Sequence, residues 1–181
     1  MLSIPLALAI LLGAAGCATV APSTPAAREL LAAPSDPADR EYLGLSAETD
    51  SFSLADVRAD VIVVEILDMY CHNCHKTAPA AKELHARFRE GPHADRVRMI
   101  GIGTGNSQLE VDAYRKKFQM PFPVLPDPDR TFSRRIGHTE TPEFVTLKRD
   151  ASGALREVYR RPGRLRDAEA MLRRILIHTN L

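Results

Sequence analysis

The chain reads VIVVEILDMYCHNC from residue 61 to residue 74, and this stretch decides the fold. Residues 61–67 are an apolar run rich in β-branched side chains, typical of a central strand covered on both faces of an α/β sheet. After Cys74, apolar side chains recur every three or four positions, which indicates a helix. These are Ala78, Ala81, Leu84 and Phe88. The sequence therefore predicts a buried strand that runs directly into a helix, with two cysteines at the junction.

The rest of the chain continues this alternation of strands and helices. We expect strands at 42–45, 52–54, 97–102, 120–125, 143–148 and 155–159, and helices at 109–118, 131–136 and 165–175. A chain of 181 residues, 45% of them hydrophobic, can bury one core of respectable size. We therefore predict a single α/β domain over residues 41–181.

Charge and cysteine content exclude several classes of protein. The 24 basic residues nearly balance the 23 acidic ones, so the net charge favours neither nucleic acid nor an anionic membrane as partner. Three cysteines are too few for a scaffold held together by disulfides. A local basic cluster is interleaved with acidic residues and is interpreted as a solvated face. It comprises Arg156, Arg160, Arg161, Arg164 and Arg166.

The N-terminus has the pattern of an export signal. Residues 4–15 are almost purely apolar and too short to span a bilayer, which predicts a signal peptide over residues 1–17. Residues 18–40 are rich in Ala, Pro and Ser, and we expect them to form a flexible tether. The protein is thus expected in the periplasm.

Ala14-Ala15-Gly16-Cys17 resembles a bacterial lipoprotein box. This resemblance implies that Cys17 is lipidated and becomes the N-terminus after cleavage. Thr19 stands where an aspartate would favour retention in the inner membrane, so an outer-membrane lipid anchor is implied. The alternative is ordinary cleavage nearby, at Ala18 or Ala21, without a lipid.

The spacing of Cys71 and Cys74 predicts redox chemistry. Three residues apart on a first helical turn, the two sulfurs lie on one face and can form a disulfide. Cys71 also lies at the positive end of the helix dipole, near unpaired N–H groups that stabilise a thiolate. We expect Cys71 to attack a disulfide of a partner and Cys74 to resolve the mixed disulfide that forms.

Residues from about 52 to 175 resemble the thioredoxin-like family, in particular its exported TlpA/ResA-type (redoxin-like) thiol-disulfide oxidoreductases. The matching pieces are the strand at 61–67, the CHNC motif, Pro79, the segment 122–129 and Thr141-Pro142. The resemblance implies a three-layer thioredoxin-like α/β fold with a central mixed sheet. It also implies an extra strand and helix inserted before a cis-proline.

The resemblance also implies roles for individual residues. Pro142 is expected to be the cis-proline facing the disulfide, with the Thr141 backbone as a docking edge for an extended substrate. Tyr70 replaces the tryptophan usual before the first cysteine and is expected at the substrate surface. His72 and Asn73, between the cysteines, are expected to tune the potential.

Glu65 lies six residues before Cys71, where thioredoxins carry a buried acid that assists proton transfer to the resolving cysteine. Burial would raise its pKa and suit it to that role. The alternative is a carboxylate that reaches solvent or a lysine. His75 and His85 are interpreted as helix-surface residues.

The expected partners are proteins with a disulfide or dithiol. If the task is reduction, a membrane electron donor is also implied, with an apocytochrome or a mispaired secreted protein as substrate. No cofactor and no metal are predicted.

Three other interpretations compete with the redox one. Cys71 to His75 also fits the Cys-x-x-Cys-His pattern of c-type haem attachment, and the cysteines with His72 and His75 could bind copper or zinc as a chaperone does. A strand before the motif and Thr141-Pro142 after it favour the redox interpretation. A peroxiredoxin is rejected because no threonine lies at the expected place among residues 67–70.

Overall fold

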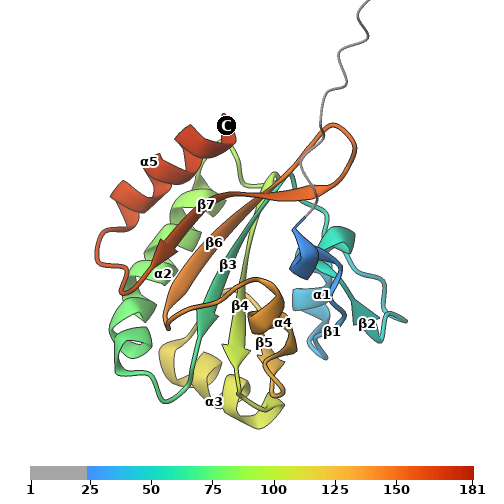
Figure 1. Cartoon of the computed structure of the whole chain (residues 1–181), viewed down its shortest axis with the longest axis vertical. Coiled ribbons are helices and arrows are strands. Elements are labelled where there is room, and N and C mark those ends of the chain that lie inside the picture. Colours follow the sequence, from blue (N-terminus) through green and yellow to red (C-terminus); the bar gives the residue numbers. More distant parts are fainter. Residues whose placement is uncertain (1–23) are drawn as a thin grey trace, which may run out of the picture.

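The structure, a computed structural model, describes residues 24–181 (Figure 1). Its centre is a five-stranded sheet in the order β5-β4-β3-β6-β7. The strands are β3 (Val61–Leu67), β4 (Val97–Thr104), β5 (Val124–Asp127), β6 (Glu143–Arg149) and β7 (Leu155–Pro162). β3 pairs in parallel with β4 and antiparallel with β6, so the sheet is mixed, as predicted.

Helices cover both faces of this sheet, and β3 shows why. All seven of its residues are buried, with Val61, Val63 and Leu67 in one core and Ile62, Val64 and Ile66 in the other. Strand residues alternate between faces, so a strand that is apolar throughout needs a layer on each side. The predicted three-layer α/β architecture is confirmed.

The first core lies under three helices (Figure 1). They cover the face of the sheet that also carries the C-terminal helix. They are α2 (His72–Glu90), α3 (Gln108–Phe118) and α5 (Ala168–Thr179). The second core lies under α4 (Thr131–Arg135) and the N-terminal segment. Between β4 and β6 the chain adds α3, β5 and α4, which contain the predicted extra strand and helix.

Residues 24–40, expected to belong to the tether, are part of the folded domain. They contain a 3₁₀ turn η1 (Pro25–Arg28), β1 (Leu31–Ala32) and the start of α1 (Pro37–Leu43). β1 pairs with β2 (Ser51–Phe52), and a second 3₁₀ turn η2 (Leu54–Asp56) follows. Apolar side chains of this segment, Ala26, Ala27 and Leu31, are buried in the second core, and this burial offsets the cost of ordering the chain.

The strand expected at 42–45 is wrong for a local reason. Asp36 caps a helix there by accepting a hydrogen bond from the Ala38 amide, and Pro37 occupies the first turn. Gly44, at φ +76°, ends that helix. The predicted signal peptide and Cys17 lie outside the described residues. Within residues 24–181, no helix is long and apolar enough to cross a membrane.

An ion pair ties the N-terminal segment to α3. The buried carboxylate of Asp39 accepts hydrogen bonds from both terminal nitrogens of Arg115, which lies 76 positions away in the chain. Burial raises the pKa of Asp39, although Arg115 opposes that shift. The guanidinium is therefore what compensates the buried carboxylate.

Arg115→Met should destabilise the protein. The substitution keeps the apolar stem but leaves the buried Asp39 carboxylate without its donor, which costs about 1–3 kcal/mol. Urea denaturation followed by circular dichroism measures the loss. Lys116→Met, at an exposed neighbour, should change the unfolding free energy by less than about 0.5 kcal/mol. Equal losses in the two variants would contradict this role of Arg115.

Candidate active site

Cys71 lies at the junction of β3 and α2, as the N-cap residue of the helix. Its sulfur accepts a hydrogen bond from the Cys74 amide nitrogen at 3.2 Å. The helix N-terminus supplies further unpaired N–H groups and the positive end of the dipole. This arrangement stabilises negative charge on the Cys71 sulfur.

Cys74 lies in a different environment one turn further along. Its side chain is fully buried and belongs to the first core. Burial raises the pKa of the Cys74 thiol, and the interaction with Cys71 raises it further. Both cysteines are free thiols in this structure. The pair is therefore asymmetric, with an accessible sulfur at Cys71 and a protonated, shielded one at Cys74.

Thr141 and Pro142 lie opposite Cys71 although they are 70 residues away in the chain. The peptide bond between them is cis, and the Cys71 thiol donates a hydrogen bond to the Thr141 carbonyl oxygen at 3.3 Å. The Pro142 carbonyl in turn accepts from the Gly163 amide at 2.8 Å. The tertiary structure thus brings together the CHNC motif and the Thr-Pro pair that the sequence singled out.

Glu65 lies in the middle of β3 with its side chain completely buried. Neither carboxylate oxygen has a hydrogen-bond partner within residues 24–181, and burial raises the pKa of Glu65 to about 8. Burial is the main cause of the raised pKa values of Cys74 and Tyr114, and Glu65, when ionised, raises both further. The Glu65 side chain is buried, as the first of the two interpretations expects. The alternative, a carboxylate that reaches solvent or a lysine, is wrong.

Tyr70 stands on the surface beside Cys71, with 70% of the residue exposed. Its hydroxyl donates a hydrogen bond to Glu110 at 2.7 Å, and Glu110 also accepts from the amide and hydroxyl of Ser107. These hydrogen bonds lower the pKa of Glu110. Sequence reasoning missed this residue, although Ser107 and Glu110 have the spacing of a capping box.

Asn106 is a second residue that the sequence did not reveal. Its buried side-chain amide accepts from the Met69 amide nitrogen at 2.8 Å and donates to the Asp68 carboxylate at 3.1 Å. These two bonds hold the turn that presents Tyr70 and Cys71. A single asparagine after a glycine-rich strand end carries no pattern that would have identified it.

The histidines near the motif have unequal surroundings. His72 is exposed, as is Asn73, and neither side chain has a hydrogen bond to another described residue. The His75 ring nitrogen Nε2 lies 2.6 Å from the Met69 carbonyl oxygen. The centroid of the His75 ring lies 4.9 Å from the centroid of the Phe118 ring. His75 is therefore already engaged within this fold, which disfavours its use as a haem ligand.

His85 is buried, so the prediction of a surface residue is wrong. Its ring lies between those of Tyr42 and Phe122, and burial lowers the pKa of His85 to about 4. Among residues 24–181, no three His, Cys, Asp or Glu side chains converge on one point. The donor set for a copper or zinc chaperone is thus not assembled in the part of the chain that is described.

Comparisons with known proteins agree with this geometry. The model of the AhpC/TSA family matches residues 36–159. No curated protein sequence is significantly similar to the chain.

Solved structures have the same fold at low sequence identity. A secreted Mycobacterium tuberculosis disulfide oxidoreductase homologous to E. coli DsbE is 21% identical, with a TM-score of 0.56 over 76% of this chain and 98% of that one. StoA from Bacillus subtilis is 15% identical, with a TM-score of 0.54 over 71% and 90%. A conserved protein from Geobacillus kaustophilus is 17% identical, with a TM-score of 0.62 over 87% and 82%.

Glu65→Gln should remove a component of the pH dependence of stability. The folded protein holds a proton on Glu65 up to about pH 8, whereas the unfolded chain releases it near its ordinary pKa of 4.5. The folded state binds more protons between these values, so stability falls as pH rises, by about 1.4 kcal/mol per pH unit. Urea denaturation across that interval should show this slope in the wild type relative to Glu65→Gln.

The matched control is Glu90→Gln, which changes an exposed carboxylate at the end of α2. Its pH profile should run parallel to that of the wild type. If the profile of Glu65→Gln also runs parallel to it, Glu65 does not titrate with folding and the assignment of a buried acid is refuted.

Proposed function

We propose, from the premise that this chain belongs to the AhpC/TSA family of thioredoxin-like thiol-disulfide oxidoreductases, that it exchanges electrons with protein disulfides through Cys71 and Cys74. One observation carries the proposal. The Cys71 sulfur is held by the Cys74 amide at the start of α2 and faces the Thr141 carbonyl beside Pro142. A nucleophilic sulfur therefore lies next to a backbone edge that can dock a substrate.

The reaction follows from the asymmetry of the two sulfurs. The Cys71 thiolate attacks one sulfur of a partner disulfide, which breaks that bond, forms a mixed disulfide and releases the other partner sulfur as a thiolate. Cys74 then loses its proton, and its thiolate attacks the Cys71 sulfur. This breaks the mixed disulfide, forms the Cys71-Cys74 disulfide and releases the second partner sulfur as a thiolate, which takes a proton from solvent. The ionised form of the Glu65 carboxyl accepts the Cys74 proton, and its raised pKa of about 8 brings its proton affinity closer to that of a thiol.

The residues around Cys71 would receive the substrate. The Thr141 backbone offers an edge for an extended segment, as in β-augmentation, and Pro142 lies beneath it. Tyr70, anchored through its hydroxyl to Glu110, offers an exposed ring next to the reacting sulfur. His72 and Asn73, on the first turn of α2, would set the reduction potential.

The proposed location is the periplasm, after export by a signal peptide over residues 1–17. Support comes from the apolar run at 4–15, which has the pattern of an export signal. A lipid on Cys17 would anchor the protein to the outer membrane. In that compartment a reductase needs a membrane electron donor, and an apocytochrome or a mispaired secreted protein is the proposed substrate.

Cys74→Ser should trap partners covalently. Without the resolving thiol the mixed disulfide on Cys71 persists, and reducing agent releases it. Non-reducing electrophoresis after incubation with a disulfide-containing protein measures the adducts. Cys71→Ser should give few adducts, because Cys74 is fully buried. Equal trapping by both variants would contradict the assigned roles.

The reduction potential of the couple measures the direction of electron flow, with about −270 mV typical of a reductase and about −120 mV of an oxidant. We expect His72→Ala to make the potential more negative, because a protonated imidazole beside Cys71 favours the thiolate and hence the reduced form. His178→Ala, an exposed histidine on α5, should leave the potential unchanged. A shift in neither variant would remove His72 from the tuning role.

A further inference from the structure

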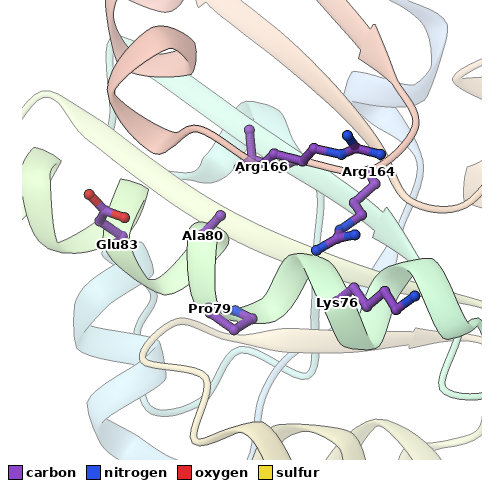
Figure 2. A pocket seen from close by; sticks show the side chains of 7 residues that line it. Lys76, Pro79, Ala80, Glu83, Arg164 and Arg166 are labelled. Atoms are coloured by element: carbon purple, nitrogen blue, oxygen red, sulfur yellow. The ribbon is translucent and has the colours of Figure 1, made fainter.

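A pocket lies between α2 and the loop that leads from β7 into α5 (Figure 2). Its volume is about 550 Å³. Four residues of α2 line one wall, and loop residues 164–166 line the other. The α2 residues are Lys76, Pro79, Ala80 and Glu83.

The loop wall is fixed in place and connected to the active site. The Gly163 amide donates to the Pro142 carbonyl at 2.8 Å, and the buried Leu165 amide donates to the Thr77 hydroxyl on α2 at 3.1 Å. The Arg161 guanidinium binds the carbonyl oxygens of Gly163 and Arg164, each at 2.9 Å. A hydrogen bond thus joins the loop wall to the cis-proline.

The helix wall starts at the reacting sulfur. Lys76 lies five residues after Cys71, about 7.5 Å along α2 at 1.5 Å per residue. His72, Lys76 and Pro79 follow one another at spacings of four and three, so they share a face of the helix. The pocket therefore lies along the helix that begins at Cys71, next to the loop that is hydrogen-bonded to Pro142.

The pocket is cationic at the end near Cys71. Lys76, Arg164 and Arg166 line it, and none of the three forms an ion pair within residues 24–181. The Arg164 Nε atom is buried and has no hydrogen-bond partner among the same residues. Figure 2 shows Arg164 pointing from the loop toward α2, with Glu83 at the opposite end of the pocket from Lys76.

The one carboxylate of the pocket does not neutralise these charges. Glu83 lies two turns further along α2 and is paired with Arg87 at 2.8 Å. Three cations that face one space repel one another, and a partner with negative charge relieves this repulsion and satisfies the buried Arg164 nitrogen. Arg164 and Arg166, which the sequence pattern assigns to a solvated face, therefore also line a pocket that can receive a negatively charged group.

We propose that this pocket binds an acidic segment of the substrate protein, so that Asp or Glu side chains near the substrate disulfide contact Lys76, Arg164 and Arg166 while Cys71 attacks. The inference rests on the proposed function and names its substrate class. A peptide segment suits the pocket better than a small anion does, because about 550 Å³ holds several side chains and Pro79, Ala80 and Leu165 add apolar surface.

The test uses the reduced full-length protein and three synthetic peptides. Each peptide carries the same intramolecular disulfide, followed by three Glu, three Gln or three Lys residues. Stopped-flow measurement gives the second-order rate of disulfide reduction at low and high salt. We expect the Glu peptide to react about tenfold faster than the Lys peptide at low salt, and we expect high salt to reduce this ratio.

Charge reversal at the pocket should abolish this preference. Arg166→Glu and Lys76→Glu should each slow the Glu peptide about fivefold and leave the rate with the Gln peptide nearly unchanged. Arg174→Glu is the matched control, because it makes the same change of net charge at an exposed site of α5 outside the pocket. Alkylation of Cys71 by uncharged iodoacetamide checks that its reactivity is intact.

The outcomes separate the two proposals. Reaction with none of the peptides refutes the proposed function itself. Reaction with all three at equal rates, or equal effects of Arg166→Glu and Arg174→Glu, overturns only the acidic-segment site. Inhibition by inorganic phosphate at constant ionic strength, without discrimination among the peptides, would identify a site for small anions and also overturn it.

Discussion

The burial of β3 on both faces is the constraint on which the rest of the structure depends. A strand without a solvent-facing side needs helices above and below, and the polar turn at its end must lie at the edge of the sheet. α2 begins there, and its unpaired amides point away from the core. Cys71 occupies that position, so the same packing that stabilises the domain also places the reacting sulfur at an anion-stabilising helix end.

Cys74 and Glu65 are both buried near the N-terminus of α2. Cys74 packs in the first core, and Glu65 is buried without a hydrogen-bond partner among the described residues. A buried carboxyl is tolerated because it can stay protonated, and the same property lets it exchange a proton near neutral pH. Thus a carboxyl whose burial lowers stability above pH 4.5 has the raised pKa that the proposed proton transfer needs.

The proposed substrate site is built from elements in distant parts of the chain. Asn106 and Glu110 hold the turn before Cys71 and the Tyr70 ring, while Gly163 joins the loop before α5 to Pro142. None of these residues reacts. Their hydrogen bonds hold the turn and the loop around Cys71, next to the proposed docking edge, the Tyr70 ring and the cationic pocket.

The pairing of the CHNC motif with Thr141-Pro142 came from the resemblance to the thioredoxin-like family. Local patterns in the sequence determined β3, the helix that starts at the CHNC motif and the order of the later strands. These depend on periodicity and on residues close together in the chain. The tertiary structure alone decided that residues 24–40 pack on the domain and that His85 is buried. It also decided that Asn106 and Glu110 support the turn before Cys71, and that Lys76, Arg164 and Arg166 line one pocket. The reason is that burial and charge environment arise from contacts between distant residues, as between Asp39 and Arg115, which no local pattern encodes.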